Sequence, residues 1–263
     1  GKSGYPLLFQ TGETADGETH LVDRQHPHNF FVELGSSYAK PITDKHSLFL
    51  YAGIVGEPAL GPAVYMHRLS GNLNPEAPIT HHWFDSTHIT NGVLTLGLTH
   101  PLYKIEASLF HGREPSQNRY RIELGQLDSY SARFTLNPTP DISMQISAAH
   151  LKSPEALEPT INMNKWIASM TFNQTILGGL SQTTLGFGRN DPSQGHASNA
   201  YLLESSWNIY TTNSVFYRLE RADKNELFSH DPLAESSFNI TKLSLGAEHV
   251  FGTEQSMKKS IGI

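Results

Sequence analysis

The chain has 263 residues, of which 38% are hydrophobic, 17% are charged and none is cysteine, and it is long enough for one large domain or two small ones. Its 19 Lys and Arg against 25 Asp and Glu give a formal net charge of -6, which argues against a nucleic-acid partner because binding to a phosphate backbone needs a positive surface. The mean hydropathy is -0.36 and no apolar stretch approaches the ~20 residues of a membrane helix, so helical membrane spans are excluded, whereas a membrane β-barrel is not.

The two ends of the chain and its even composition predict one domain over residues 1–263. The chain opens Gly1-Lys2-Ser3-Gly4, without the charged start and apolar run of a secretory signal, so we expect a mature or truncated chain. Within this domain we expect an N-terminal segment, 1–27, with a strand near Tyr5–Thr11, and a long loop over 55–92. The absence of cysteine fits a cell-envelope location.

Apolar and polar residues alternate along most of the chain, which is the period of a β-strand. Helical spacing is scarcely visible, so we expect an all-β protein. The segments that alternate are, in chain order, Phe30–Gly35, Ser47–Ile54, Leu94–Thr99, Tyr103–Phe110, Tyr130–Asn137, Ile142–Ala148, Trp166–Phe172, Leu185–Phe187, Tyr201–Ile209, Val215–Leu219, Leu243–Ala247 and, more weakly, Ser256 to the end.

The connections between these segments alternate between short and long. Along the chain, short turns such as Thr99–Pro101 and Asn137–Asp141 alternate with long polar segments such as Val55–Gly92 and Gly112–Ser129. This layout predicts an antiparallel up-and-down transmembrane β-barrel of about 12–14 strands, with short turns at one end and long loops at the other. The residues opposite the apolar set would then line a polar lumen: Glu33, Lys104, Glu106, Arg133, Arg218, Glu220, Lys242 and Glu248.

A soluble, lipocalin-like barrel would show the same alternation, with the charged residues in water and the apolar ones inside. The number of strands favours the membrane barrel, because about twelve strands enclose more space than side chains alone can fill. Aromatic residues near the strand ends, Tyr38, Tyr130 and Trp207 among them, match the interfacial girdles of membrane barrels.

In this arrangement of strands and loops the whole chain resembles bacterial outer-membrane β-barrel proteins of the porin-like kind, although it carries no signature motif. The resemblance implies a place in the Gram-negative outer membrane, contact with outer-membrane lipid and lipopolysaccharide, and passive transport of small hydrophilic solutes or ions. Such barrels usually end on an aromatic residue, whereas this chain ends Ile261-Gly262-Ile263. We therefore expect the last strand to be incomplete.

The longest loop is rich in proline, glycine and apolar residues from Glu57 to Arg68, which is unusual for a solvated loop tip. Loops of this length within a compact fold are usually functional or disordered, and the apolar content argues against disorder. We expect the loop to enter the lumen as a constriction or plug. The alternative is a packed extracellular cap without a role in transport.

Histidine is unusually frequent, with 14 residues, ten of them between His20 and His111. Imidazoles and carboxylates that converge at one end of the barrel could bind Zn²⁺ or Cu²⁺, so a metal-binding envelope barrel is the alternative function. Histidines that form hydrogen bonds in ordered loops are the simpler interpretation. The candidate ligands are His26, His28, His67, His81, His82, Asp85, His88 and His111.

Ser86, His88 and Asp85 are the residue types of a hydrolytic triad, and outer-membrane phospholipases are also barrels. A single loop rarely supplies all three members in a productive orientation, and the His-x-Ser-Asn-Gly pattern of those phospholipases is not matched. We therefore expect no enzymatic activity. A closed structural or adhesive barrel is a further alternative to the channel.

Overall fold

The computed structural model describes residues 29–116, 118–156, 158–210, 212–224, 237–254 and 257–262. In these residues, 12 strands form one sheet, accompanied by a short helix, α1 (His81–Phe84), and a 3₁₀ turn, η2 (Ser86–His88). The strands are β1 (Leu34–Pro41), β2 (Ser47–Gly56), β3 (Thr90–His100), β4 (Tyr103–Phe110), β5 (Ser129–Thr139), β6 (Ile142–Leu151), β7 (Met163–Ile176), β8 (Gly179–Pro192), β9 (Ser198–Ile209), β10 (Asn213–Lys224), β11 (Phe238–Glu254) and β12 (Met257–Gly262).

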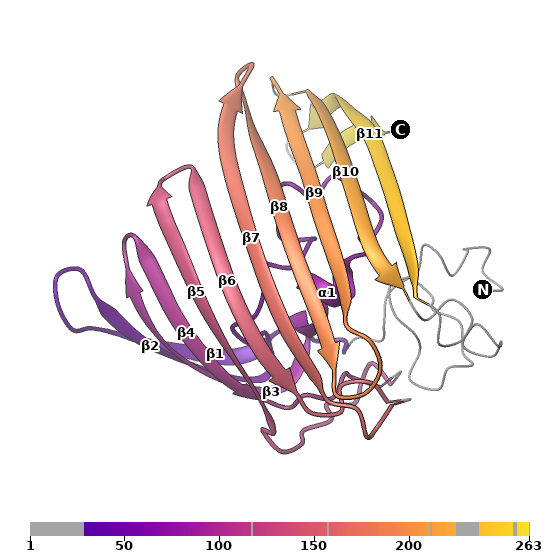
Figure 1. Cartoon of the computed structure of the whole chain (residues 1–263). Helices are drawn as coiled ribbons and strands as arrows, with labels where there is room; N and C mark the ends of the chain where they lie inside the picture. The colour runs from indigo at the N-terminus through magenta and orange to yellow at the C-terminus, as the bar shows by residue number, and fades with distance from the viewer. Residues whose placement is uncertain are drawn as a thin grey trace.

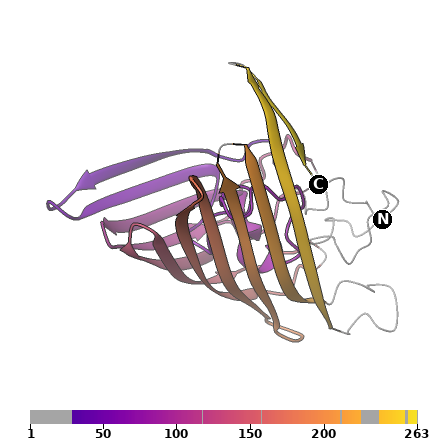
Figure 2. The same ribbon diagram turned by 90° about the horizontal axis from the view of Figure 1, so that it is seen from above.

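The strand order in the sheet follows the sequence order, and each described pair is antiparallel, so the all-β, antiparallel prediction is confirmed. The sheet curves strongly, and the segment between β2 and β3 lies on its concave side (Figures 1 and 2). The predicted closure into a barrel is not observed. Within the described part of the chain β1 pairs only with β2 and β12 only with β11, so the sheet is open. The strand predicted near Tyr5–Thr11 lies outside the described residues.

Short and long connections alternate along the sheet. The turn between β7 and β8 consists of Leu177 and Gly178, both with positive φ, which is the two-residue geometry that matches the twist of a hairpin. The other short turns on this side include 101–102 and 140–141, whereas the long connections on the opposite side include 57–89, 111–128 and 152–162. Long connections therefore gather at one end of the sheet.

The first strand begins later than the alternation predicts, at Leu34 instead of Phe30. The backbone N–H of Phe30 donates to the carbonyl oxygen of Arg119 at 2.6 Å, and its ring lies 5.7 Å from that of Tyr120. Phe30 is therefore held by the connection between β4 and β5 and not by a neighbouring strand. A strand near the end of the chain, predicted to begin at Ser256, is present as β12.

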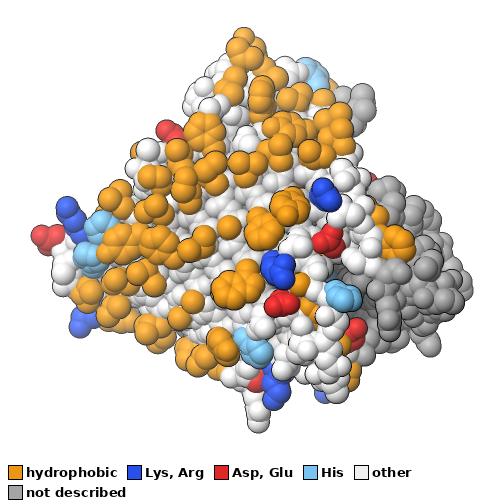
Figure 3. All heavy atoms as spheres, viewed as in Figure 1, with side chains coloured by type: hydrophobic (Ala, Val, Ile, Leu, Met, Phe, Trp, Pro, Cys, Tyr) orange, Lys and Arg blue, Asp and Glu red, His pale blue; other side chains and the backbone are white. Residues whose placement is uncertain are grey.

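The exposed, convex face of the sheet carries apolar side chains, whereas the concave face carries buried charged ones. On the convex face Leu96 is 58% exposed, Ile146 61% and Leu245 69%, whereas on the concave face Glu106 is 4% exposed and Glu204 is fully buried. Apolar side chains spread over the convex face in Figure 3, and charged ones gather toward the strand ends. The alternation in the sequence thus separates an exposed apolar surface from a buried face that carries charged side chains.

Candidate functional site

The concave face of the sheet is covered by residues 57–89, which we call the inward loop. Near the end of the sheet with the long connections, its apolar side chains pack against inward-facing residues of the strands. Phe84 and Trp83 lie against β8 at Gly186 and Gly188, where an added Cβ would come within 2.8 Å of either side chain. The glycines of β8 therefore leave the space that α1 occupies. We call the inward-facing residues of the strands the wall. The apolar cluster includes Leu60, Ile79, Trp83 and Phe84 of the loop with Val93, Phe110, Leu151, Ile167 and Leu202 of the wall.

A buried network of charges joins the inward loop to β9 and β10. Arg68 of the loop donates from Nε to Glu204 Oε1 at 2.7 Å and from Nη1 to Asp85 Oδ2 at 2.8 Å. Arg218 of β10 donates from Nε to the other oxygen of Glu204 at 3.0 Å, and Ser70 Oγ donates to Oε1 at 3.0 Å. Glu204 is therefore shared between a loop arginine and a wall arginine. Because the pairs are fully desolvated, each charge depends on its partners to stay ionised.

Further contacts attach the loop on the same side of the sheet. Glu220 accepts from the hydroxyl and the backbone N–H of Thr80, at 2.9 and 3.2 Å. Lys165 of β7 donates from Nζ to Ser86 Oγ at 3.0 Å and to the carbonyl oxygen of His82. These contacts reach the loop from β7 and β10, so several strands hold it in place.

On the β5 side the loop is held by a hydrogen bond from Arg133 to its backbone. Arg133 donates from Nη1 to the carbonyl oxygen of Gly61 at 2.9 Å and from Nε to Glu106 at 2.9 Å. Glu106 also pairs with Lys104 at 2.7 Å. Gly61 has a φ of +68°, and its N–H donates to Ser147 Oγ at 2.9 Å, so the loop turns sharply where it meets the wall.

Burial and neighbouring charges shift the pKa values of Asp85, His88 and Glu57 in the inward loop. Burial opposes the ionisation of Asp85, but His81 and Arg68 outweigh it and hold the pKa of this carboxyl well below its usual range. Burial, together with His81, lowers the pKa of His88 to about 4. Burial raises the pKa of Glu57 to about 7, with Asp85 also raising it and Arg133 opposing the shift. At neutral pH the loop therefore carries a charged Asp85 and a neutral His88.

The candidate metal ligands are only partly brought together. His81, His82, Asp85 and His88 lie in or beside α1 and η2, with His81 Nδ1 2.6 Å from Asp85 Oδ1 and the rings of His81 and His88 5.1 Å apart. Burial, followed by His81 and Lys165, lowers the pKa of His82 well below its usual value.

The remaining candidate ligands lie apart from that turn or beyond the described residues. His67 is an exposed residue of the same loop and faces a hollow that His88 also lines. His111 contacts the carbonyl oxygen of Gln126, and His26 and His28 lie outside the described residues. No group of three or more His, Asp or Glu side chains in the described part of the chain is arranged to hold a metal ion. Metal binding stays a prediction.

Of the residues expected to line a lumen, those on β10 and β11 are buried or half-buried. Arg218 and Glu220 are fully buried beneath the inward loop, and Lys242 pairs with Glu76 of the loop at 2.7 Å. Glu248 is half-buried on β11. Arg218, Glu220 and Lys242 therefore contact the inward loop.

The other expected lining residues surround a hollow between the loop and the first strands. The hollow has a volume of about 310 Å³, and Glu57, His67 and His88 of the loop face it. Its wall includes Tyr51 and Thr95, together with the predicted residues Glu33, Lys104, Glu106 and Arg133. The concave face thus retains a polar space on the β1–β5 side of the loop.

The described contacts of Ser86, His88 and Asp85 do not connect them as the serine, histidine and aspartate of a hydrolytic triad. Ser86 Oγ accepts from Lys165, and the imidazole beside the Asp85 carboxylate belongs to His81. His88 Nδ1 instead lies 2.8 Å from the backbone oxygen of Asp85. Triad chemistry requires a nucleophile hydrogen-bonded to a base that is in turn hydrogen-bonded to a carboxylate, and the described contacts of Ser86, His88 and Asp85 do not form this chain.

The central ionic residues of the network, Arg68, Glu204 and Lys165, are absent from the set predicted from the sequence. A usable signal exists for the two wall residues. Glu204 lies among the residues that alternate with Tyr201 and Leu203, and Lys165 directly precedes Trp166, so both belong to the inward set of their strands. Arg68 has no such signal, because the loop has no period to follow.

No helix in the described ranges is long and apolar enough to cross a membrane. A comparison with protein-family models finds no model that matches this chain, and a comparison with curated proteins finds no match either.

Proposed function

We propose that this chain is a channel-forming β-barrel protein of the Gram-negative outer membrane that passes small hydrophilic solutes or ions. The convex face would contact lipid, the concave face would form the lumen, and the inward loop would narrow that lumen. The single observation that carries the proposal is the inverted polarity of the sheet. Large apolar side chains exposed over a whole sheet face are costly in water and are expected of a wall that contacts lipid.

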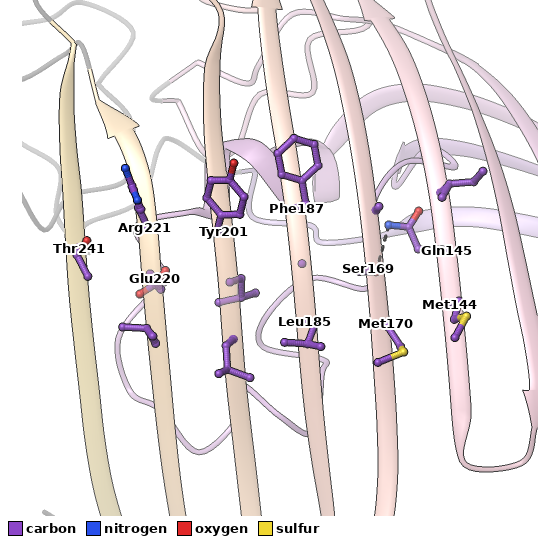
Figure 4. Close-up of a pocket in the computed structure, with 16 residues that line it drawn as sticks. Met144, Gln145, Ser169, Met170, Leu185, Phe187, Tyr201, Glu220, Arg221 and Thr241 are labelled. Carbon is purple, nitrogen blue, oxygen red and sulfur yellow. Dashed lines mark hydrogen bonds between the residues drawn. The ribbon is translucent and has the colours of Figure 1, made fainter.

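The convex face also carries a continuous apolar surface. A shallow hollow of about 720 Å³ runs over β6 to β11, and Figure 4 shows Met144, Met170 and Leu185 on its floor, with Phe187 and Tyr201 nearer the ends of β8 and β9. The floor is almost entirely apolar. Monomeric soluble proteins rarely expose a continuous apolar patch larger than a few hundred Å².

Three tryptophans allow a direct test of this orientation. Trp166 is 55% exposed and Trp207 39% exposed on the convex face, whereas Trp83 is 4% exposed within the inward loop. Single-tryptophan variants, with the other two residues replaced by phenylalanine, are folded into vesicles that contain lipids with brominated acyl chains. Quenching of Trp166 and Trp207 but not of Trp83 is expected. Equal quenching of all three, or of none in folded protein, would contradict the proposal.

Conduction is tested separately in a planar bilayer. Lys104 faces the polar hollow and its side chain is 37% exposed, so Lys104→Gln is expected to shift the reversal potential in a salt gradient toward cations. Lys40→Gln is the matched control, because Lys40 pairs with Leu48 on the convex side near a short turn. Absence of single-channel steps from inserted protein would reject the channel while leaving the membrane barrel intact.

A further inference from the structure

Two arginines lie at one end of the apolar hollow on the convex face, Arg221 in its lining and Arg189 just beyond it, two residues after Phe187 on β8. Arg221 of β10 lines the hollow and pairs across the sheet with Tyr201, and Arg189 of β8 pairs with Trp166. Figure 4 places Arg221 near the end of β10, level with Tyr201, while Leu185 and Met170 lie further along the floor. A positive group therefore lies beside the aromatic residues where the apolar floor ends.

These arginines differ from those of the concave face in their partners. Arg68, Arg133 and Arg218 each pair with at least one carboxylate. Within the described ranges neither Arg189 nor Arg221 forms an ion pair with a carboxylate. Their side chains are instead held by neutral amides, and a guanidinium in that state keeps donors and charge available for an anion.

The amides that hold the two arginines belong to one hydrogen-bonded row. Arg189 Nη1 donates to Asn199 Oδ1 at 3.3 Å, and Arg221 Nε donates to Asn239 Oδ1. Asp223 accepts from both asparagines and lies two residues beyond Arg221 on the same strand. Along the strands the apolar floor is followed by the arginines, level with their cross-strand partners Tyr201 and Trp166, and then by Asp223, so the positive charge lies closer to the apolar surface than the aspartate does.

We infer that this surface binds a membrane lipid with an anionic phosphate headgroup. The phosphate would contact Arg189 and Arg221, and the acyl chains would occupy the hollow below them. The inference rests on the proposed membrane location. Two features carry it: the arginine pair supplies charge complementary to a phosphate, and the apolar floor of the adjoining shallow hollow suits acyl chains.

Trp166 reports on the site, because it is the cross-strand neighbour of Arg189. A variant with Trp166 as its only tryptophan is folded into phosphatidylcholine vesicles that contain brominated phosphatidylglycerol, or brominated phosphatidylcholine at the same fraction. We expect a relative binding constant of about fivefold or more in favour of phosphatidylglycerol. The preference should fall to about one in Arg189→Gln/Arg221→Gln.

A variant with Trp207 as its only tryptophan is the matched control, because Trp207 lies on the same face near the opposite end of β9. It is expected to show no preference. Equal quenching of Trp166 by the two brominated lipids would overturn the lipid site and leave the membrane location intact. Absence of quenching by either lipid would instead overturn the proposed function.

A second measurement needs no tryptophan substitution. Native mass spectrometry of the protein, extracted from vesicles of mixed phosphatidylglycerol and phosphatidylcholine, counts the lipids that stay bound. Retention of phosphatidylglycerol by the original chain and its loss in Arg189→Gln/Arg221→Gln supports the site. Equal retention by both proteins overturns it.

Discussion

Replacement of Glu204 by glutamine removes the carboxylate that links the inward loop to the wall. The substitution keeps the shape of the side chain but leaves Arg68 and Arg218 without the charge that both contact, at 2.7 and 3.0 Å. Arg68 keeps Asp85 as a partner at 2.8 Å, so the uncompensated charge is mainly that of Arg218. Removal of one partner from a buried ion pair costs 3–5 kcal/mol in general, and we expect about 3 kcal/mol here because one arginine keeps a carboxylate.

The assay is urea unfolding of the protein in lipid vesicles, followed by tryptophan fluorescence. Glu158→Gln is the matched control, because Glu158 is exposed in the connection between β6 and β7, and its free energy of unfolding should change by less than about 0.5 kcal/mol. The double variant Glu204→Gln/Arg218→Met should be less destabilised than the two single changes together, since it removes both charges of the pair. A free energy for Glu204→Gln within the error of the control would refute the assignment of the network as the anchor of the loop.

Three further predictions concern the same loop. Ser70 and Thr184 have hydroxyl oxygens 2.7 Å apart, so Ser70→Cys/Thr184→Cys should form a disulfide under mild oxidation, seen as a gel shift; an unlinked pair would show that the loop leaves the wall. Burial raises the pKa of Glu57 from 4.5 to about 7, so the folded state favours its neutral form. The stability that Glu57 contributes is therefore lost as the pH rises from about 4.5 through 7. Glu57→Gln should therefore raise the urea midpoint, relative to the original chain, more at pH 8 than at pH 5, and an equal change at both would contradict this. Gly61→Ala should cost at least about 2 kcal/mol, because its Cβ would lie 2.0 Å from the oxygen of Phe84 at a positive φ, whereas Gly195→Ala, with open space and φ of +94°, should cost about 1 kcal/mol by the same unfolding assay.

The sheet could be predicted from the sequence because each strand carries its own signal. Leu94, Leu96 and Thr95 show the alternation directly, and the pairing of each strand with its sequence neighbours follows from the short turns. The start of β1 could not be predicted. Phe30 continues the apolar alternation, but its backbone N–H is taken by Arg119, a contact between residues far apart in the sequence.

The loop was harder to predict than the sheet, because its contacts are long-range. Composition indicates that residues near Glu57 do not form a solvated tip, and the structure places Leu60 and Phe84 against the concave face. No local pattern indicates that Arg68 meets Glu204, which is 136 residues further along the chain. The histidines illustrate the same limit, since their density predicts a cluster but not that Asp85 would be shared between His81 and Arg68.

The charges of the concave face explain why the loop lies there. A sheet that turns its apolar side outward must present its polar side inward, and the inward loop fills space along the concave face of this open sheet. Buried charges such as Glu204 and Lys165 need partners when that space excludes water, and the inward loop supplies Arg68 to one and a backbone carbonyl oxygen to the other.

In the proposed channel, the distribution of these anchors would set where a passage lies. Lys165 of β7, Glu204 of β9 and Arg218 of β10 attach the loop on one side of the concave face, and the hollow of about 310 Å³ remains on the other side, next to Lys104. The charges that hold the loop are therefore distinct from most of those that a solute would meet. Selectivity should follow substitutions near Lys104, and loop stability should follow substitutions near Glu204.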